Sequence, residues 1–368
     1  MVEPYVKTRI QTLFHSLEKP VDAIIIKNAT QPFTDSTFFY VTGLEQGLFE
    51  GSLALLYPDG SADLVISELE AETAKNTQSS LHIYKTKTEA EQLIKQLTSS
   101  LHHIGVHFQG LLHRDFCSLQ NICTQVTFQD ISPAITQTRL IKDTQELKHL
   151  THACRIADRV MNDIPSLLNK NMHEYELAAE INYRLEKYGA EKPAFTTIST
   201  FGKNTAEPHY SHGETTLQPG DFVLCDFGAC VHGYNSDMTR TFVYGKGNQK
   251  QQEMHQTVLQ AQSKGLTTIR PGVPASEVHH AVASYIDSTP FKGLFIHSTG
   301  HSLGLSVHDG PGFATDSTLL LKENMVLTVE PGIYIPGYGG VRIEDDILVT
   351  KNGATLLTQS SREYTEIS

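Results

Sequence analysis

The sequence predicts two domains of mixed α/β (α+β) architecture, residues 1–135 and residues 136–368. Its length of 368 residues favours two domains, because most domains hold roughly 100 to 200 residues. Short apolar runs alternate with helical stretches in the first part, which is typical of α/β proteins. The second part contains one order of elements twice, which indicates an internal duplication.

The first domain is predicted from apolar runs of strand length. One such run lies at 21–26, and a pair lies within 51–67. Asp59 and Gly60 interrupt this pair with a turn signal, which predicts a hairpin. A helical pattern follows at 89–101.

The second domain is predicted to begin with a long amphipathic helix over 144–168, for which Asp143 is a suitable N-cap. A helix over 173–188 follows, and then paired strands. The same order returns with helices at 250–268 and 274–287 before a second set of strands. The sequence therefore predicts two similar halves in this domain.

Composition excludes several classes of function. The net charge of −12, without a basic run, opposes binding to nucleic acid. No apolar stretch approaches the roughly 20 residues that cross a bilayer. The five cysteines form no C-x-x-C pair, so we expect them to be reduced and structural. These features predict a cytoplasmic protein that binds neither nucleic acid nor a membrane.

Four carboxylates lie in strand-like runs, where burial of an unpaired charge is unfavourable. Asp226 and Asp237 are equidistant from the bond between Val231 and His232, and Glu330 and Glu344 are equidistant from Gly337. The two residues of each pair are therefore expected to face each other across a hairpin, with Cα atoms about 5 Å apart. Two divalent cations, about 4 Å apart, would offset the repulsion. A solvated sheet face explains any one of these acids, but not four in mirrored hairpins.

Histidines near the hairpins could complete a metal site. His297, His301 and His308 occur in one glycine-rich segment, and His209 lies before the first hairpin. A nitrogen ligand in an oxygen-rich site favours manganese, cobalt or zinc over calcium. Residues two apart on a strand share a face. Thr239, Thr328, Arg342 and Asp346 are therefore expected to orient the ligands.

Three blocks of the second domain form a recognisable pattern. They are AFTTISTFGKNTAEPHYSHG with GDFVLCDFGACVHGYNSDMTRTF, then HSTGHSLGLSVHDGPG, and then LKENMVLTVEPGIYIPGYGGVRIEDDIL. In these blocks the sequence resembles the pita-bread metallopeptidases, specifically the Xaa-Pro aminopeptidases and Xaa-Pro dipeptidases (prolidases). DSTFFYVTGL resembles the start of the family's N-terminal domain. The resemblance implies a creatinase/prolidase-like N-terminal α/β domain followed by a pseudo-symmetric pita-bread catalytic domain.

The resemblance also implies a metal site with two divalent ions per subunit, manganese being favoured over cobalt or zinc. Asp226 is expected to hold the first ion, Asp237 and Glu344 to bridge both, and His301 and Glu330 to complete the second. The implied reaction is hydrolysis of the Xaa-Pro bond at the N-terminus of a peptide or in a dipeptide, by a water activated between the metals.

The same resemblance implies substrate contacts, catalytic residues and an assembly. His209, His297, His308 and Arg342 are expected to contact the substrate, with His308 near the scissile carbonyl. The three histidines and Glu330 are expected to take part in catalysis. The implied assembly is a homodimer.

Three alternatives stay open at this point. A methionine-aminopeptidase-like enzyme shares the five ligands, although the PHY segment and the N-terminal domain favour the Xaa-Pro branch. A non-catalytic peptide-binding module is the second alternative. Within the Xaa-Pro branch, dipeptidase and aminopeptidase are both open. Asp309 stands where many relatives carry glutamate, and Ser306 stands at a commonly acidic place, which leaves the length of the substrate open.

Overall fold

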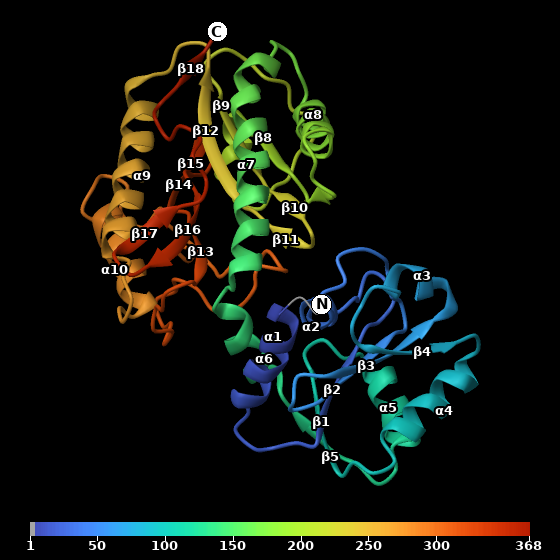
Figure 1. Cartoon of the computed structure of the whole chain (residues 1–368). Helices are drawn as coiled ribbons and strands as arrows, with labels where there is room; N and C mark the ends of the chain where they lie inside the picture. Colours follow the sequence, from blue (N-terminus) through green and yellow to red (C-terminus); the bar gives the residue numbers. More distant parts are fainter. Residues whose placement is uncertain (1–3) are drawn as a thin grey trace. The chain divides into compact units, whose positions relative to one another are not determined.

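The computed structural model describes residues 4–368 in two compact units, Met1–Arg139 and Leu140–Ser368. Figure 1 colours the first unit blue to green and the second green to red. Each unit has its own sheets and its own apolar core. Among the described residues, no helix is both long and apolar enough to cross a membrane.

The first unit is built on one six-stranded mixed sheet in the order β4-β3-β2-β1-β5-β6. The expected hairpin at Gly60 is present, with Leu56 opposite Ala62. Side chains on the buried sheet face, such as Ile25, Leu55 and Ile104, form the core. The strands are β1 (Ala23–Lys27), β2 (Leu53–Leu56), β3 (Ala62–Ser67), β4 (Ser80–Tyr84), β5 (His103–Val106) and β6 (Thr127–Asp130).

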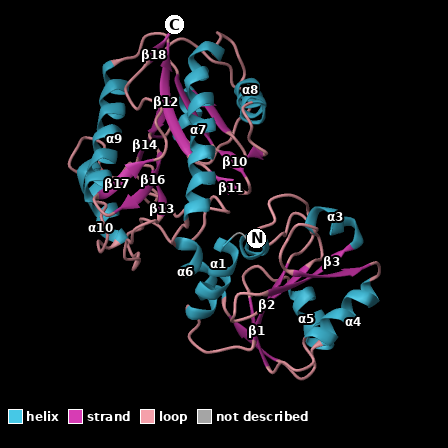
Figure 2. Ribbon diagram, viewed as in Figure 1, coloured by secondary structure: helices cyan, strands magenta, loops and turns pink. Residues whose placement is uncertain are grey.

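Helices pack around this sheet, as the ribbon in Figure 2 shows. The second of them is capped by Asp35, whose carboxylate accepts from Thr37 N and pairs with His107 Nδ1 at 2.6 Å. The helices are α1 (Pro4–His15), α2 (Ser36–Thr42), α3 (Ala71–Ala74), α4 (Lys87–Leu97), α5 (His113–Ile122) and α6 (Ser132–Leu140), with a 3₁₀ turn at Glu68–Glu70.

The first half of the second unit begins with α7 (Thr144–Leu167), whose N-terminus carries a capping box formed by Asp143 and Glu146. Its apolar face, with Val160, packs with Ile181 of α8 (Glu174–Lys187) onto the sheet residue Phe227. The strands of this half are β7 (Lys192–Pro193), β8 (Ile198–Phe201), β9 (Phe222–Phe227), β10 (Ala229–Val231), β11 (Tyr234–Asn235) and β12 (Met238–Tyr244), with a 3₁₀ turn at Gly202–Ala206.

The second half repeats this order, as the sequence predicts. Helices α9 (Gln249–Thr268) and α10 (Ala275–Asp287) precede the strands β13 (Val326–Val329), β14 (Gly332–Ile335), β15 (Gly339–Arg342), β16 (Asp345–Thr350) and β17 (Gly353–Leu356). The last strand, β18 (Glu366–Ile367), returns to the first half and pairs with β12. The pseudo-symmetric α/β architecture of this domain is therefore as expected.

Candidate metal centre

The first two carboxylates lie on the hairpin of β9 and β12, in a register that differs from our prediction. Asp226 lies opposite Thr239, so it is diagonal to Asp237 and does not face it directly. The turn is centred on His232 and Gly233, which both have left-handed backbones with φ of 49° and 77°. This pattern is typical of a two-residue hairpin turn. The ladder is shifted by two residues, and an even shift keeps both carboxylates on one face.

The second pair has the predicted register. Val329 lies opposite Asp345 at the end of one ladder, and Gly332 lies opposite Arg342 at the start of the next. Both ladders have Gly337 at their midpoint, so Glu330 and Glu344 are placed opposite each other between them.

A neighbouring segment brings His301 to these carboxylates. Its residues run alongside β13, because Thr328 N donates to His301 O at 2.9 Å and Glu330 N donates to Thr299 O at 2.8 Å. The approach requires Gly300, where an added Cβ would lie 2.0 Å from the Thr328 carbonyl oxygen. The segment thereby places the imidazole of His301 next to Glu330.

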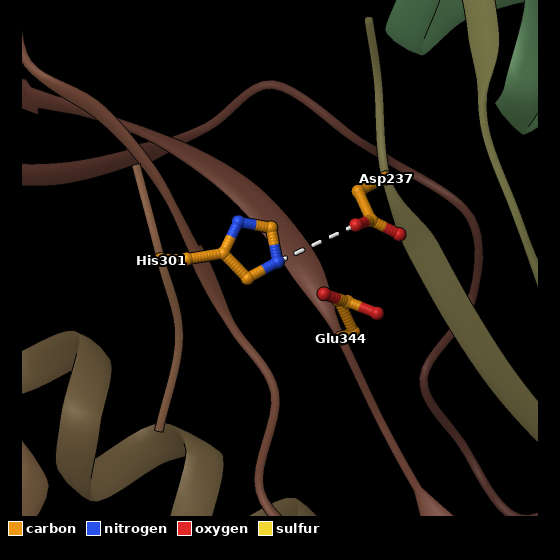
Figure 3. Close-up of side chains that lie close together, drawn as sticks. All are labelled: Asp237, His301 and Glu344. Carbon is orange, nitrogen blue, oxygen red and sulfur yellow. Dashed lines mark ion pairs between the residues drawn. The ribbon is translucent and has the colours of Figure 1, made fainter. Parts of the chain in front are cut away.

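Asp237, His301 and Glu344 form the tightest cluster. Each offers a ligand atom, and these atoms lie within 4.8 Å of one another. Figure 3 shows the two carboxylates and the imidazole pointing toward a common point. His301 Nε2 is 3.6 Å from Asp237 Oδ2 and 3.6 Å from Glu330 Oε1. Glu330 thus borders the cluster through His301, while Asp226 lies next to it on the sheet.

Burial and like charge raise the pKa of three of these carboxyls. Burial, followed by the charge of Glu344, holds the pKa of Asp237 well above its usual range. Burial, followed by the charge of Glu330, does the same for Glu344. Burial also raises the pKa of Glu330 to about 7, although Arg342 opposes the rise. Burial lowers the pKa of His301 to about 4, so its imidazole is neutral and able to bind a cation.

These donors fit divalent cations. Asp226 Oδ1 and Asp237 Oδ1 are buried, and neither has a hydrogen-bond partner among residues 4–368. Buried carboxylate oxygens without partners are unfavourable unless a cation or a proton compensates them. Four carboxylates with one imidazole form a donor set that suits manganese, cobalt or zinc.

Neighbouring polar groups hold the candidate ligands in place. Thr239 Oγ1 donates to Glu344 Oε2 at 2.6 Å. Asp346 Oδ2 accepts from the backbone N–H of Asp237 at 2.9 Å. Arg342 Nη2 donates to Asp226 Oδ2 at 2.6 Å. Thr239, Arg342 and Asp346, for which the strand alternation predicts an orienting role, thus each contact a candidate ligand. Thr328 Oγ1 also lies 3.4 Å from Glu330 Oε1.

Tyr334 belongs to the site and was not predicted. Its hydroxyl accepts from Arg342 Nη1 at 2.9 Å and lies 2.9 Å from His297 Nε2. Since arginine only donates, the hydroxyl proton is directed to His297 Nε2. The other nitrogen, Nδ1, then donates to Ser298 O at 2.8 Å. The sequence signal that could have identified it is strand alternation, because Glu330, Gly332 and Tyr334 are two residues apart and therefore share a face.

The remaining predicted residues are placed as follows. The ring centroid of His308 is 4.3 Å from that of His301. His297 has partners at both ring nitrogens, and its Nδ1 lies 4.0 Å from Glu330 Oε2. Burial lowers the pKa of His297 to about 4, and the nearby charges of Arg342 and His209 add to the lowering. Arg342 is only 3% exposed, and its guanidinium contacts Asp226, Thr239 and Tyr334.

Comparison with known proteins covers both units. Residues 148–351 match the sequence model of metallopeptidase family M24, and residues 9–141 match that of the creatinase/prolidase N-terminal domain. An Xaa-Pro dipeptidase of Pyrococcus horikoshii is 35% identical over 96% of this chain and 98% of its own length.

Solved structures agree with these matches. The crystal structure of the prolidase from Pyrococcus horikoshii has a TM-score of 0.87 at 34% identity, covering 97% of this chain and 99% of that one. The X-Pro aminopeptidase from Thermotoga maritima has a TM-score of 0.89 at 28% identity, covering 94% and 98%.

Proposed function

Because the chain belongs to metallopeptidase family M24 and carries a creatinase/prolidase N-terminal domain, we propose that it hydrolyses the Xaa-Pro bond at the N-terminus of peptides or in dipeptides. One observation carries the proposal. Asp237, His301 and Glu344 converge on one point in a chain that aligns over 96% of its length with an Xaa-Pro dipeptidase. We propose Asp226, Asp237, His301, Glu330 and Glu344 as the ligands of two divalent ions, with manganese favoured.

When bound, such ions supply Lewis acidity to a peptide carbonyl and lower the pKa of water. The protein's own groups perform the remaining tasks. The Glu330 carboxylate accepts a proton from the attacking water and delivers it to the leaving proline nitrogen. The His308 imidazole donates a hydrogen bond to the carbonyl oxygen as that oxygen gains charge. The water oxygen bonds to the carbonyl carbon and the carbon–nitrogen bond breaks; the second proton of the water also passes to the proline nitrogen, giving a free carboxylate and a protonated proline amine.

The positions of the other site residues support more limited roles. His297 lines the site with its ring edge, since Tyr334 and Ser298 occupy its two nitrogens. His209 contacts the substrate from the segment whose Pro208 carbonyl lies 3.5 Å from Arg342 Nη1. Arg342 acts on the substrate indirectly, because its guanidinium is buried and orients Asp226.

Proline selectivity and peptide length are tested together. The Xaa-Pro bond is a tertiary amide without N–H, so a site shaped for the proline ring should reject Leu-Gly. A dipeptidase closes the space beyond proline and holds its carboxylate, whereas an aminopeptidase leaves that space open. We propose dipeptides as the preferred class and compare kcat/KM for Leu-Pro, Leu-Gly and Leu-Pro-Gly-Gly. Equal cleavage of Leu-Gly would overturn proline selectivity, and preferred cleavage of the tetrapeptide would make the protein an Xaa-Pro aminopeptidase.

We further propose a cytoplasmic homodimer that binds no nucleic acid. All five cysteines are free, which suits a reducing compartment, and the net charge of −12 repels phosphate backbones. Sedimentation equilibrium tests the assembly: a mass near 82 kDa, about twice that of the 40.8 kDa chain, is expected, and a monomer across the micromolar range would overturn it.

A further inference from the structure

The loop from His301 to Asp309 forms an ion pair with a lysine from a distant part of the chain. The Lys142 side chain has no exposed surface, and its Nζ lies 3.4 Å from Asp309 Oδ2, whose side chain is 7% exposed. Lysine is almost never fully buried unless it is paired, because its ammonium group loses hydration. A buried ion pair across 167 residues of sequence therefore needs a reason in the fold.

Backbone hydrogen bonds bring the two segments together. Lys142 N donates to Asn324 O at 2.9 Å, and Leu303 N donates to Val326 O at 3.0 Å. The lysine and the loop thus lie along neighbouring residues at the start of β13, the strand that leads to Glu330. The Lys142 ammonium group is thereby held against the loop.

The loop is shaped around the ion pair. A Cβ added at Gly304 would lie 2.2 Å from Asp309 Oδ2 and 2.9 Å from Lys142 Nζ, so the pair occupies the space of that side chain. Asn235 Nδ2 donates to Gly304 O at 3.1 Å, and Asp309 N donates to Ser302 O at 2.8 Å. These hydrogen bonds hold the loop in place around the Lys142–Asp309 ion pair.

We propose that Lys142 is a positioning residue for peptide hydrolysis: by holding Asp309, it fixes the adjacent His308 next to His301. The ring centroids of the two histidines are 4.3 Å apart with an interplanar angle of 80°. The inference rests on the proposed function, in which His308 acts on the scissile carbonyl. Without the ammonium group, the Asp309 carboxylate loses the charge that holds it in the loop, so it shifts, and the adjacent His308 moves with it.

The main test is a double-mutant cycle with Leu-Pro as substrate and manganese at full occupancy. Lys142→Met keeps the length of the side chain and removes the charge. We expect it to lower kcat about 10- to 100-fold, the usual effect of losing an outer contact of a site, with KM and metal content within about twofold. In the His308→Ala background, Lys142→Met should alter kcat less than about twofold, because the imidazole that Lys142 positions is already missing. Lys148→Met, at an exposed position of α7, is the matched control and should leave kcat unchanged.

A second variant covers the case in which Lys142→Met does not fold. Gly304→Ala removes no charge, but its methyl group displaces the Asp309 carboxylate. Gly304→Ala should also lower kcat in the wild-type background, and it should leave kcat almost unchanged in the His308→Ala background. Equal fold losses of kcat in the two backgrounds would overturn the proposal, because Lys142 would then support the fold and not His308. Loss of metal with the loss of kcat would overturn it as well.

A spectroscopic measurement separates this inference from the proposed function. The imidazole signal of His308, assigned by its absence from His308→Ala, should shift in Lys142→Met or Gly304→Ala and stay in place in Lys148→Met. If the wild-type protein cleaves no Xaa-Pro peptide, the proposed function fails, while this shift still decides whether Lys142 positions His308. An unchanged His308 signal in the folded variants would overturn the positioning role.

Discussion

Replacement of Glu344 by glutamine should change metal affinity and the stability of the metal-free protein in opposite directions. Thr239 Oγ1 donates to Glu344 Oε2 at 2.6 Å, so the amide oxygen of glutamine will take this contact. The amide N–H₂ then points toward the place where a cation would bind, where it repels positive charge.

The magnitudes follow from the surroundings of Glu344. Loss of an outer contact of a metal site already lowers affinity about 10- to 100-fold, so removal of a charged ligand should exceed about 100-fold. In the metal-free protein, burial and the charges of Glu330 and Asp226 disfavour the Glu344 carboxylate. A neutral amide relieves this repulsion by about 1 kcal/mol or more, equivalent to about 2 to 4 °C in Tm for a domain of this size.

The assay compares wild type and Glu344→Gln after chelation and after addition of manganese. Metal content, Tm and kcat/KM for Leu-Pro are measured on the same samples. We expect a higher Tm without metal, a smaller rise of Tm with metal, and loss of activity. Asp316→Asn in a loop outside the site is the control and should match wild type. A Glu344→Gln protein with full metal content and normal turnover would remove Glu344 from the site.

Three further predictions concern single residues. His308→Ala should lower kcat for Leu-Pro at least about tenfold while metal content survives; loss of metal from the folded variant would make His308 a ligand. Asp35→Asn should destabilise the N-terminal domain by about 1 to 3 kcal/mol at pH 7. Although burial raises the pKa of Asp35, hydrogen bonds from His107 and Thr37 lower it below its usual value. The Asp35 carboxylate therefore stabilises the fold above about pH 4, and this stabilisation is lost as the pH falls through the folded pKa. The difference in the free energy of unfolding between wild type and Asp35→Asn, measured in urea, should become smaller in that range. Lys27→Met should stabilise the same domain by about 2 kcal/mol below pH 8, since burial lowers the pKa of Lys27 to about 8. This gain in stability should vanish as the pH rises toward about 10.5, where the unfolded state also loses the proton. A constant gain between about pH 7 and 10 would contradict this prediction.

The alternation of strand residues predicted which carboxylates gather at the candidate metal centre. Glu330 and Glu344 have the expected register because the turn between them is centred on Gly337, with φ of 75°, which the sequence marks with glycine. The register of Asp226 and Asp237 was wrong by two residues because His232 also adopts a left-handed backbone. A left-handed backbone is uncommon at any residue other than glycine, even at histidine, where it occurs more often than at most, so the sequence gives no clear signal for it.

Contacts between distant segments could not be predicted from local patterns. The local sequence around Lys142 gives no indication that this charged residue is buried. Only the fold shows that it lies against Asp309. Tyr334 shares the alternation that identifies Glu330, but its contacts to His297 and Arg342 depend on how two strands and a loop pack. Helix boundaries were easier, since capping residues such as Asp143 mark them directly.

The most direct test of the account is Leu-Pro hydrolysis by chelated protein to which manganese is returned in steps, with metal content measured at each step. We predict no hydrolysis in the stripped protein and a rate that rises with occupancy until two ions are bound per chain, with Leu-Gly cleaved at least about tenfold more slowly. Full occupancy by manganese, cobalt or zinc without hydrolysis of Leu-Pro would contradict the account, and so would hydrolysis that persists after the metal is removed.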